Sequence, residues 1–428
     1  MSNSFSASIV STPRGMRRRV IATALRVVVV DEGEGSGRLS DMVTRDEALH
    51  RDAADELASR RDDFLIPDPA LVYLDGNSLG RTPKRAVERL QRVITEEWGT
   101  DLIGSWSHWV DKPQRVGNLL APLIGARPGE VAVHDSTTVN LYQLVHGAAA
   151  LRPDRRVLAI DEHDFPSDRY VVDGIAEATG RSVRHGFAHL DDVAVVVRSV
   201  VDYRTAAVVD VGAETARAHA AGALVVWDLS HAAGVLEIDL GAAGAQLAVG
   251  CTYKYLNGGP GSPAFTYVAK ELQGEITQPI WGWFSQRDQF AMGPLYEPRS
   301  DITRMLIGTP SILALAGAEV GIELTAEVGI ARIAAKARAL TSFGIELCDR
   351  FGLTTCSPRA DLQRGGHISV VHPEARALCR KLIERGVVPD FREPDLVRLG
   401  MSPLTTRFVD VYDGIAALNS LVEVAHGH

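Results

Sequence analysis

The sequence holds 428 residues, of which 46% are hydrophobic, and carries a formal net charge of −9. A chain of this length can bury a large core and commonly folds as two domains. The acidic balance, with a sequence pI of about 5.8, argues against a broad nucleic-acid-binding surface. The four cysteines show neither metal-ligand spacing nor a disulfide framework, so a reducing, cytoplasmic location is expected.

The N-terminal segment differs from the rest of the chain. Three arginines, Arg17 to Arg19, precede an apolar run over residues 20–30, but Arg26 interrupts the run and an acidic stretch follows it. A secretory signal needs an uninterrupted apolar segment, and no run approaches the ~20 apolar residues that span a bilayer. We therefore expect residues 1–43 to be a disordered extension, with the natural start near Met42. A weak targeting segment is the alternative.

From residue 45 onward, strand-like apolar runs alternate with helical patterns. The expected strands cover residues 131–134, 156–160, 194–201, 223–227 and 247–251. The expected helices between them cover residues 139–151, 168–179 and 215–221. Such alternation predicts an α/β fold with a mostly parallel sheet and right-handed crossovers. Functional sites in such sheets gather at the carboxyl ends of the strands.

The pattern changes near residue 310. A long helix is expected over residues 311–340, with a break near Gly329, and leads to an αββα-like segment that ends in a helix over 409–424. This predicts a second, smaller domain. The expected organisation is an N-terminal arm over 44–78 that joins the small domain, a large domain over 79–308, and a linking helix with the small domain over 309–428.

The most informative stretch surrounds Lys254, which lies between Tyr253 and Tyr255 just before a glycine-rich turn. Upstream, an apolar strand pattern ends at Asp228, with His231 three residues later. This arrangement suits pyridoxal phosphate (PLP), because the lysine can form a Schiff base with its aldehyde and the carboxylate can keep its ring nitrogen protonated. A surface lysine in a loop is the alternative. The acid, histidine and glycine context favours the cofactor site.

Other segments carry groups that such a cofactor needs. Residues 135–140 follow a strand and open a helix, where N–H groups and hydroxyls can hold a phosphate, or simply cap the helix. Phe165 follows the next strand and can stack on a flat ring or pack in the core. Trp283 lies in a polar loop and can donate its indole N–H. Arg398, between apolar neighbours, suggests a carboxylate partner, with an internal salt bridge as the alternative.

In their order along the chain, these segments resemble the kynureninases, which are PLP-dependent enzymes of fold type I. The matching segments are 73–80 (YLDGNSLG), 138–141 (TVNL), 165–168 (FPSD), 227–231 (WDLSH), 252–257 (TYKYLN), 282–284 (GWF), and Arg398 with Pro403 and Leu404. They cover roughly residues 45–425. The resemblance implies a large domain with a mostly parallel seven-stranded sheet, a smaller α+β domain, and a homodimer with shared active sites.

The resemblance also implies a role for each matching residue. Lys254 binds PLP and moves protons, Asp228 pairs with the ring nitrogen, and Tyr253 is our candidate general acid. The remaining cofactor contacts are Thr137, Thr138, Phe165, Asp168, His231 and Tyr253. Trp283 and Thr309 would reach the cofactor and substrate from the second subunit, and Arg398 would bind the substrate carboxylate. No metal is expected.

The reaction implied by the resemblance is hydrolysis of L-kynurenine to anthranilate and L-alanine by Cβ–Cγ cleavage. Thr309 stands where some animal members have asparagine, which leaves the preference between kynurenine and 3-hydroxykynurenine open. Alternatives on the same fold are an aminotransferase and a cysteine desulfurase. A desulfurase would need a nucleophile such as Cys356 and would stack a histidine on the ring, where this chain has Phe165. Cys356 follows an apolar stretch, which favours a structural role.

Overall fold

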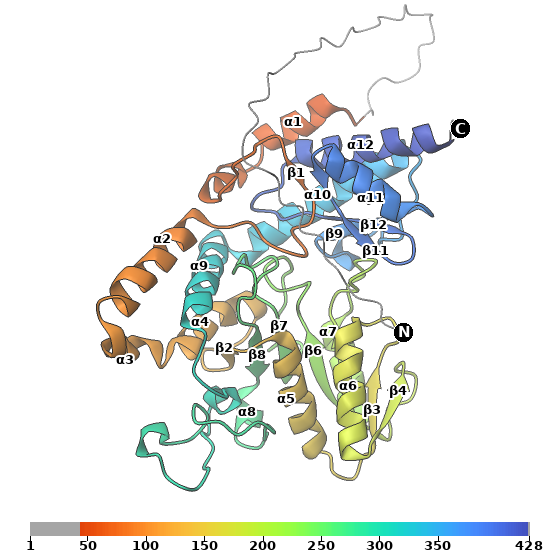
Figure 1. Cartoon of the computed structure of the whole chain (residues 1–428). Helices are drawn as coiled ribbons and strands as arrows, with labels where there is room; N and C mark the ends of the chain where they lie inside the picture. The colour runs from red at the N-terminus through yellow and green to blue at the C-terminus, as the bar shows by residue number, and fades with distance from the viewer. Residues whose placement is uncertain (1–42, 427–428) are drawn as a thin grey trace, which may run out of the picture. The chain divides into compact units, whose positions relative to one another are not determined.

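The computed structural model describes residues 43–426 (Figure 1). The predicted N-terminal extension therefore lies almost entirely outside the described residues. Among the helices that are described, none is both long and apolar enough to cross a membrane.

A seven-stranded sheet forms the centre of the larger part, as the resemblance implied. Its strand order is β2-β8-β7-β6-β5-β3-β4. Neighbouring strands from β7 to β4 are parallel, whereas β8 runs antiparallel to both β7 and β2. The strands are β2 (Val131–Val133), β3 (Val157–Ile160), β4 (Ser182–His185), β5 (Val193–Ser199), β6 (Leu224–Asp228), β7 (Leu247–Gly250) and β8 (Phe265–Val268).

The five strands expected from apolar runs are confirmed to within a few residues. The pattern analysis did not foresee β4 or β8. Strand β4 lies at the sheet edge and half of its residues are exposed, so it lacks an apolar run. Strand β8 is fully buried, but only four residues long, and follows the glycine-rich turn closely. Thr266 also interrupts the apolar residues of β8, so this strand lacks a continuous apolar run.

Helices cover both faces of this sheet, as a parallel sheet requires. The helices on this part are α5 (Thr137–Ala150), α6 (Pro166–Thr179), α7 (Val211–Ala220) and α4 (Lys112–Leu120). Along β6, Val226 packs into the core that contains α5 and α6, whereas Val225 and Trp227 pack into the core that contains α4 and α7. The alternation follows from the two-residue period of a strand.

Two long helices, α9 (Ile312–Val328) and α10 (Ile330–Arg350), follow the large sheet. The expected break is confirmed at Gly329, whose φ of +88° lies in the left-handed region that favours glycine. The second helix continues ten residues beyond the expected end at 340, because Phe343, Leu347 and Cys348 extend its buried face.

The C-terminal part holds three antiparallel strands rather than the two expected. Their order is β11 (Asp390–Arg392), β12 (Leu396–Gly400) and β9 (His367–Val371). They pack with α10, α11 (Ala375–Glu384) and α12 (Phe408–His426).

The N-terminal segment of the described chain contacts this C-terminal part. Strand β1 (Val72–Tyr73) pairs with β10 (Val387–Val388), and Arg45 of α1 (Arg45–Ala53) bonds to Asp413 at 2.8 Å. These contacts support the predicted arm, although the domain boundaries stay predictions.

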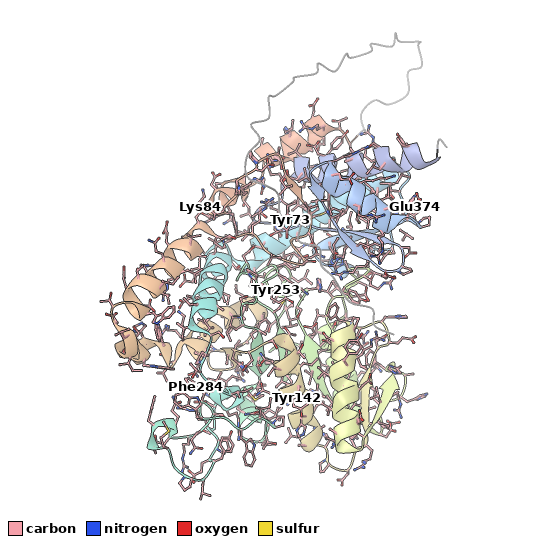
Figure 2. The ribbon with its side chains drawn as sticks, viewed as in Figure 1. Tyr73, Lys84, Tyr142, Tyr253, Phe284 and Glu374 are labelled. Atoms are coloured by element: carbon pink, nitrogen blue, oxygen red, sulfur yellow. The ribbon has the colours of Figure 1, made fainter. Side chains whose placement is uncertain are left out.

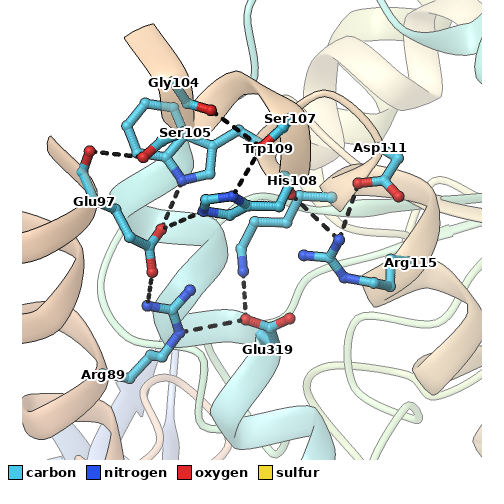
Figure 3. Close-up of polar contacts among 11 residues, drawn as sticks. Arg89, Glu97, Gly104, Ser105, Ser107, His108, Trp109, Asp111, Arg115 and Glu319 are labelled. Carbon is cyan, nitrogen blue, oxygen red and sulfur yellow. Dashed lines mark hydrogen bonds and ion pairs between the residues drawn. The ribbon is translucent and has the colours of Figure 1, made fainter. Parts of the chain in front are cut away.

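Several helices meet at a group of paired charges, which we call the Glu97 cluster (Figure 3). Glu97 accepts from Arg89 of α2 (Lys84–Arg92) at 2.5 Å and from the indole of Trp109 at 2.7 Å. Glu319 of α9 pairs with Lys112, whose side chain is 1% exposed. Burial alone would raise the pKa of Glu97, but the bonds from Arg89 and Trp109 outweigh it and lower this pKa to about 2. The cluster therefore consists of charges that the chain itself satisfies.

Candidate active site

A cavity of about 360 Å³ opens where the parallel strands end at their carboxyl side. Its wall combines residues of the large sheet with residues of β11 and β12. Figure 2 labels Tyr253, which lies between these two parts of the fold. Nine of the residues predicted from the sequence line the cavity: Thr137, Thr138, Phe165, Asp168, Asp228, His231, Tyr253, Lys254 and Arg398.

Lys254 lies four residues after the end of β7, on a tight turn. The turn is held by the N–H of Gly258, which donates to the Thr252 carbonyl at 2.8 Å, and by the Thr252 hydroxyl, which bonds to Ser262 at 2.6 Å. Lys254 Nζ is 2.9 Å from His231 Nε2. Because burial keeps the pKa of His231 well below its usual range, the imidazole is neutral and can accept from the lysine. A rigid turn thus presents an amine to the cavity.

Asp228 is the last residue of β6 and is buried. Its Oδ1 accepts from the Ser230 N–H at 2.9 Å and from the Ser230 hydroxyl at 2.6 Å. Burial raises the pKa of Asp228, although Ser230 and Lys254 oppose the rise. Asp228 Oδ1 accepts both hydrogen bonds from Ser230, so Oδ2 is available to a ligand.

Asp168 adds a second buried carboxylate in the first turn of α6. Within residues 43–426, its Oδ2 is buried and has no hydrogen-bond partner. Burial, with the charges of Asp228 and Asp164, holds the pKa of Asp168 well above its usual range. An orphaned polar atom of this kind is rare in native proteins. The donor-poor, acidic wall fits a cofactor that brings a protonated ring nitrogen, as PLP does.

The N-terminus of α5 forms the opposite end of the cavity. The expected cap is present, because the Ser136 hydroxyl accepts from the Val139 N–H at 3.4 Å. Thr137 and Thr138 nevertheless line the cavity beside the Gly261 turn. A helix N-terminus with hydroxyl groups is a favourable site for a phosphate. The cap at Ser136 therefore leaves Thr137 and Thr138 at the cavity wall.

Phe165 stands where α6 begins and is 37% exposed, so the interpretation as a core residue is wrong. Its ring meets Tyr203 edge-on, with 5.2 Å between centroids. Both side chains line the cavity. The face of Phe165 is therefore available to a flat ligand ring.

Arg398 lies in β12 and is fully buried. The internal salt bridge left open by the sequence is present, because its NH2 bonds to Asp390. NH2 also donates to the Ser78 hydroxyl at 3.0 Å, and NH1 donates to the Tyr203 carbonyl at 2.7 Å. The guanidinium still borders the cavity. Arg398 is thus held rigidly at the wall.

The further lining residues that were not predicted from the sequence include Ser78, Tyr203 and Arg392. Ser78 lies within a segment that carried the resemblance, so the sequence did contain a signal for it. Arg392 lies on β11, one strand away from Arg398. Tyr203 follows β5 without a recognisable motif, so no signal in the sequence could have found it.

Trp283 and Thr309 do not line the cavity of this chain. Trp283 packs against Phe284 and Trp106, with ring centroids 4.7 and 6.3 Å away, and Thr309 is exposed. Both were predicted to act in the site of a second subunit. Their roles therefore stay predictions.

A lysine and a carboxylate at the strand ends, a helix N-terminus for phosphate and a buried arginine define the site of a fold type I PLP-dependent enzyme. A solved cysteine desulfurase from Thermococcus onnurineus NA1 shares the fold, with a TM-score of 0.74 at 18% identity, over 85% of this chain and 98% of that one.

Sequence comparison is more specific than the fold. The family model of the kynureninase C-terminal domain matches residues 333–418. Kynureninase from Pseudomonas fluorescens is 43% identical in a 405-residue alignment that covers 89% of this chain and 96% of that protein. Kynureninase from Burkholderia pseudomallei is 42% identical over 403 residues, again 89% and 96% of the two chains. The chain belongs to the kynureninase family, and its cofactor is PLP.

Proposed function

We propose that this chain hydrolyses L-kynurenine to anthranilate and L-alanine, with Lys254 as the residue that binds PLP. The observation that carries the proposal is the cavity itself, in which Lys254, Asp228 and Arg398 face one space of about 360 Å³. Membership in the kynureninase family supports the choice of substrate.

The chain provides a complementary group for each end of the cofactor. When bound, PLP supplies an aldehyde for amines and a ring that withdraws electrons from the substrate α-carbon. In the proposal, Lys254 Nζ binds the aldehyde and Asp228 accepts a hydrogen bond from the protonated ring nitrogen. Thr137 and Thr138 hold the phosphate, and Phe165 covers one ring face.

His231 and Asp168 complete the proposed cofactor contacts. The neutral His231 accepts from Lys254 and thereby orients the amine. Asp168 lies in the first turn of α6, which follows Phe165. Its unsatisfied oxygen needs a donor, which the hydroxyl group on the cofactor ring can provide.

Arg398 is the proposed anchor of the substrate carboxylate. A guanidinium has five N–H donors. Three of them bond to Tyr203, Ser78 and Asp390, and the Asn77 amide oxygen, when turned toward Arg398, accepts from Nε at 2.9 Å. One donor remains for the substrate. Arg392 lines the same wall and adds positive charge.

Proton transfer falls to Lys254 and Tyr253. Lys254 Nζ takes the proton from the substrate α-carbon, water adds to the γ-ketone, and the Cβ–Cγ bond breaks to release anthranilate. The β-carbon then accepts a proton from the Tyr253 hydroxyl, and Lys254 Nζ returns its proton to the α-carbon, which completes L-alanine. Burial raises the pKa of Tyr253 above its ordinary value, so this hydroxyl stays protonated and can act as a general acid.

The proposal includes a homodimer in which Trp283 and Thr309 contribute to the partner's site. An apolar groove of about 440 Å³ lies beside Thr309, lined by Val93, Trp98, Pro310 and Leu313 among others. Trp98 and the nearby Ile103 are exposed. Exposed apolar side chains at a groove are typical of an interaction surface.

A cytoplasmic location is also part of the proposal. The four cysteines of the chain, Cys251, Cys348, Cys356 and Cys379, are all free thiols. Free thiols that form no disulfide are typical of a reducing compartment.

The desulfurase alternative has weaker support. Cys356 does not line the cavity. Burial raises its pKa, which disfavours the thiolate that a nucleophile requires. The resemblance to desulfurase structures at 18% identity concerns the fold alone.

Incubation of the full-length protein and PLP with L-kynurenine, and separately with L-cysteine, tests the proposal. We expect anthranilate fluorescence from kynurenine and no sulfide from cysteine. Sulfide release without anthranilate would contradict the proposal and favour desulfuration. If anthranilate forms, 3-hydroxykynurenine is the next substrate to compare.

A further inference from the structure

Two arginines of the cavity wall share one carboxylate, that of Asp390. In the β11–β12 ladder, Asp390 lies directly opposite Arg398. Arg392 is two residues from Asp390 on the same strand, so the three side chains share one face of the sheet. Asp390 Oδ2 is 2.7 Å from Arg392 NH2, and Arg398 NH2 bonds to the same oxygen. The register therefore places one acid between two cations.

The side chains of the two arginines differ in exposure and in the number of groups that hold them in place. Arg398 has an exposed side-chain fraction of 1% and bonds to Ser78 and Tyr203 as well as Asp390. Arg392 is 32% exposed. Arg398 keeps its orientation without Asp390, whereas Arg392 depends on Asp390 for its ion pair.

Acidic and basic side chains surround these two arginines. Burial raises the pKa of Asp75 to about 6, so this carboxyl is largely ionised at neutral pH. Burial also holds the pKa of His231 and His367 well below the usual range, so both are neutral. The charged and titratable groups that face the pair are Asp75, Asp390, Tyr255, His231, His367 and Lys254. The carboxylates of Asp75 and Asp390 thus offset part of the positive charge that the two guanidinium groups and Lys254 bring to this wall.

We infer that Asp390 restricts this enzyme to amino acids with a single carboxylate, because it already pairs with the Arg392 NH2 group that a second carboxylate would need. The inference rests on the proposed function, since it takes Arg398 as the anchor of the substrate carboxylate. Asp390 is a specificity-determining residue that acts through the two arginines and takes no part in bond cleavage.

Binding of simple acids to the full-length holoenzyme tests this inference without turnover. The probes are propionate, with one carboxylate, and succinate, with two, and the readout is the visible absorbance of bound PLP. In Asp390→Asn, we expect succinate to bind about tenfold more tightly than in the wild type, since one opposing charge beside Arg392 is removed. Propionate affinity should change less, about threefold or below, because Arg398 remains held by Ser78 and Tyr203.

Two variants serve as controls. Asp395→Asn changes a half-exposed acid of the same hairpin, 3.9 Å from Arg204, and should bind both acids as the wild type does. Asp390→Glu keeps the charge and should restore the preference for propionate.

Loss of affinity for both acids in Asp390→Asn, or no change for either, would overturn the inference. A wild-type enzyme that binds succinate more tightly than propionate would overturn it as well, whether or not the variant folds. If the expected pattern appears but kynurenine is not cleaved, the inference stands and the proposed substrate fails.

Discussion

The cavity and the Glu97 cluster both contain buried or partly buried carboxyl groups, but the pKa values of these groups shift in opposite directions. In the Glu97 cluster, each carboxylate has cationic partners, and the pKa of Glu97 falls to about 2 despite its burial. In the cavity, burial raises the pKa of Asp168 and Asp228, and Asp168 Oδ2 has no partner within the described residues.

This difference distinguishes carboxylates that form ion pairs within the chain from carboxylates that are available to a ligand. An ion pair whose two partners both belong to the chain stabilises the fold when their attraction exceeds the cost of desolvation. Removal of one partner leaves the other charge buried and unpaired. A carboxylate without a partner costs stability until a ligand supplies the missing donor. The comparison thus supports the proposal that Asp168 and Asp228 contact the cofactor.

The largest effect on stability is expected in the Glu97 cluster. Glu97→Gln removes the charge that faces Arg89 and should lower the free energy of unfolding by about 3 kcal/mol, the usual cost of breaking a buried pair. Chemical denaturation of the full-length protein measures the change. Glu96→Gln, at the exposed neighbouring position, is the matched control and should stay within about 0.5 kcal/mol of the wild type. Equal effects at the two positions would mean that the cluster does not hold these helices together.

A smaller effect of opposite sign is expected in the cavity. Asp168→Asn replaces an acid whose pKa is raised on folding, so the PLP-free variant should be more stable than the PLP-free wild type at pH 7, by about 1 kcal/mol. The folded wild type binds a proton more tightly than the unfolded chain does. The destabilisation of the folded wild type by Asp168 therefore grows as the pH rises above the pKa that Asp168 has in the unfolded chain. It vanishes toward pH 4.

Denaturation of the PLP-free protein at pH 4 and pH 7 checks this expectation. Asp173→Asn, on the exposed side of the same helix, is the control. A destabilised Asp168→Asn at pH 7 would show that Asp168 has a structural partner, and the contrast between the two regions would fail.

Much of the site could be predicted because its residues lie in local patterns. The strand that ends at Asp228 and the turn that carries Lys254 are both visible as apolar runs followed by polar or glycine-rich segments. Alternating strands and helices predict that these ends meet at one edge of the sheet. The structure confirms that Asp228 and Lys254 face one cavity.

The parts that could not be predicted depend on contacts between distant segments. Asp390 meets Arg398 through the register of β11 and β12, and Tyr203 meets Arg398 across separate parts of the fold. The Glu97 cluster likewise joins Arg89 and Glu319, which are 230 positions apart. A single sequence contains no periodic signal for such pairs, because their position is set by the packing of whole elements.

The most direct test of the account is to locate the lysine that holds PLP. Borohydride reduces the bond between an amine and the cofactor aldehyde to a stable linkage, and mass spectrometry of the digested protein then identifies the modified residue. We predict that the reduced cofactor is found on Lys254, and that Lys254→Ala carries none and does not turn over kynurenine. Reduced cofactor on another lysine, or turnover by Lys254→Ala, would contradict the assignment on which the proposed site rests.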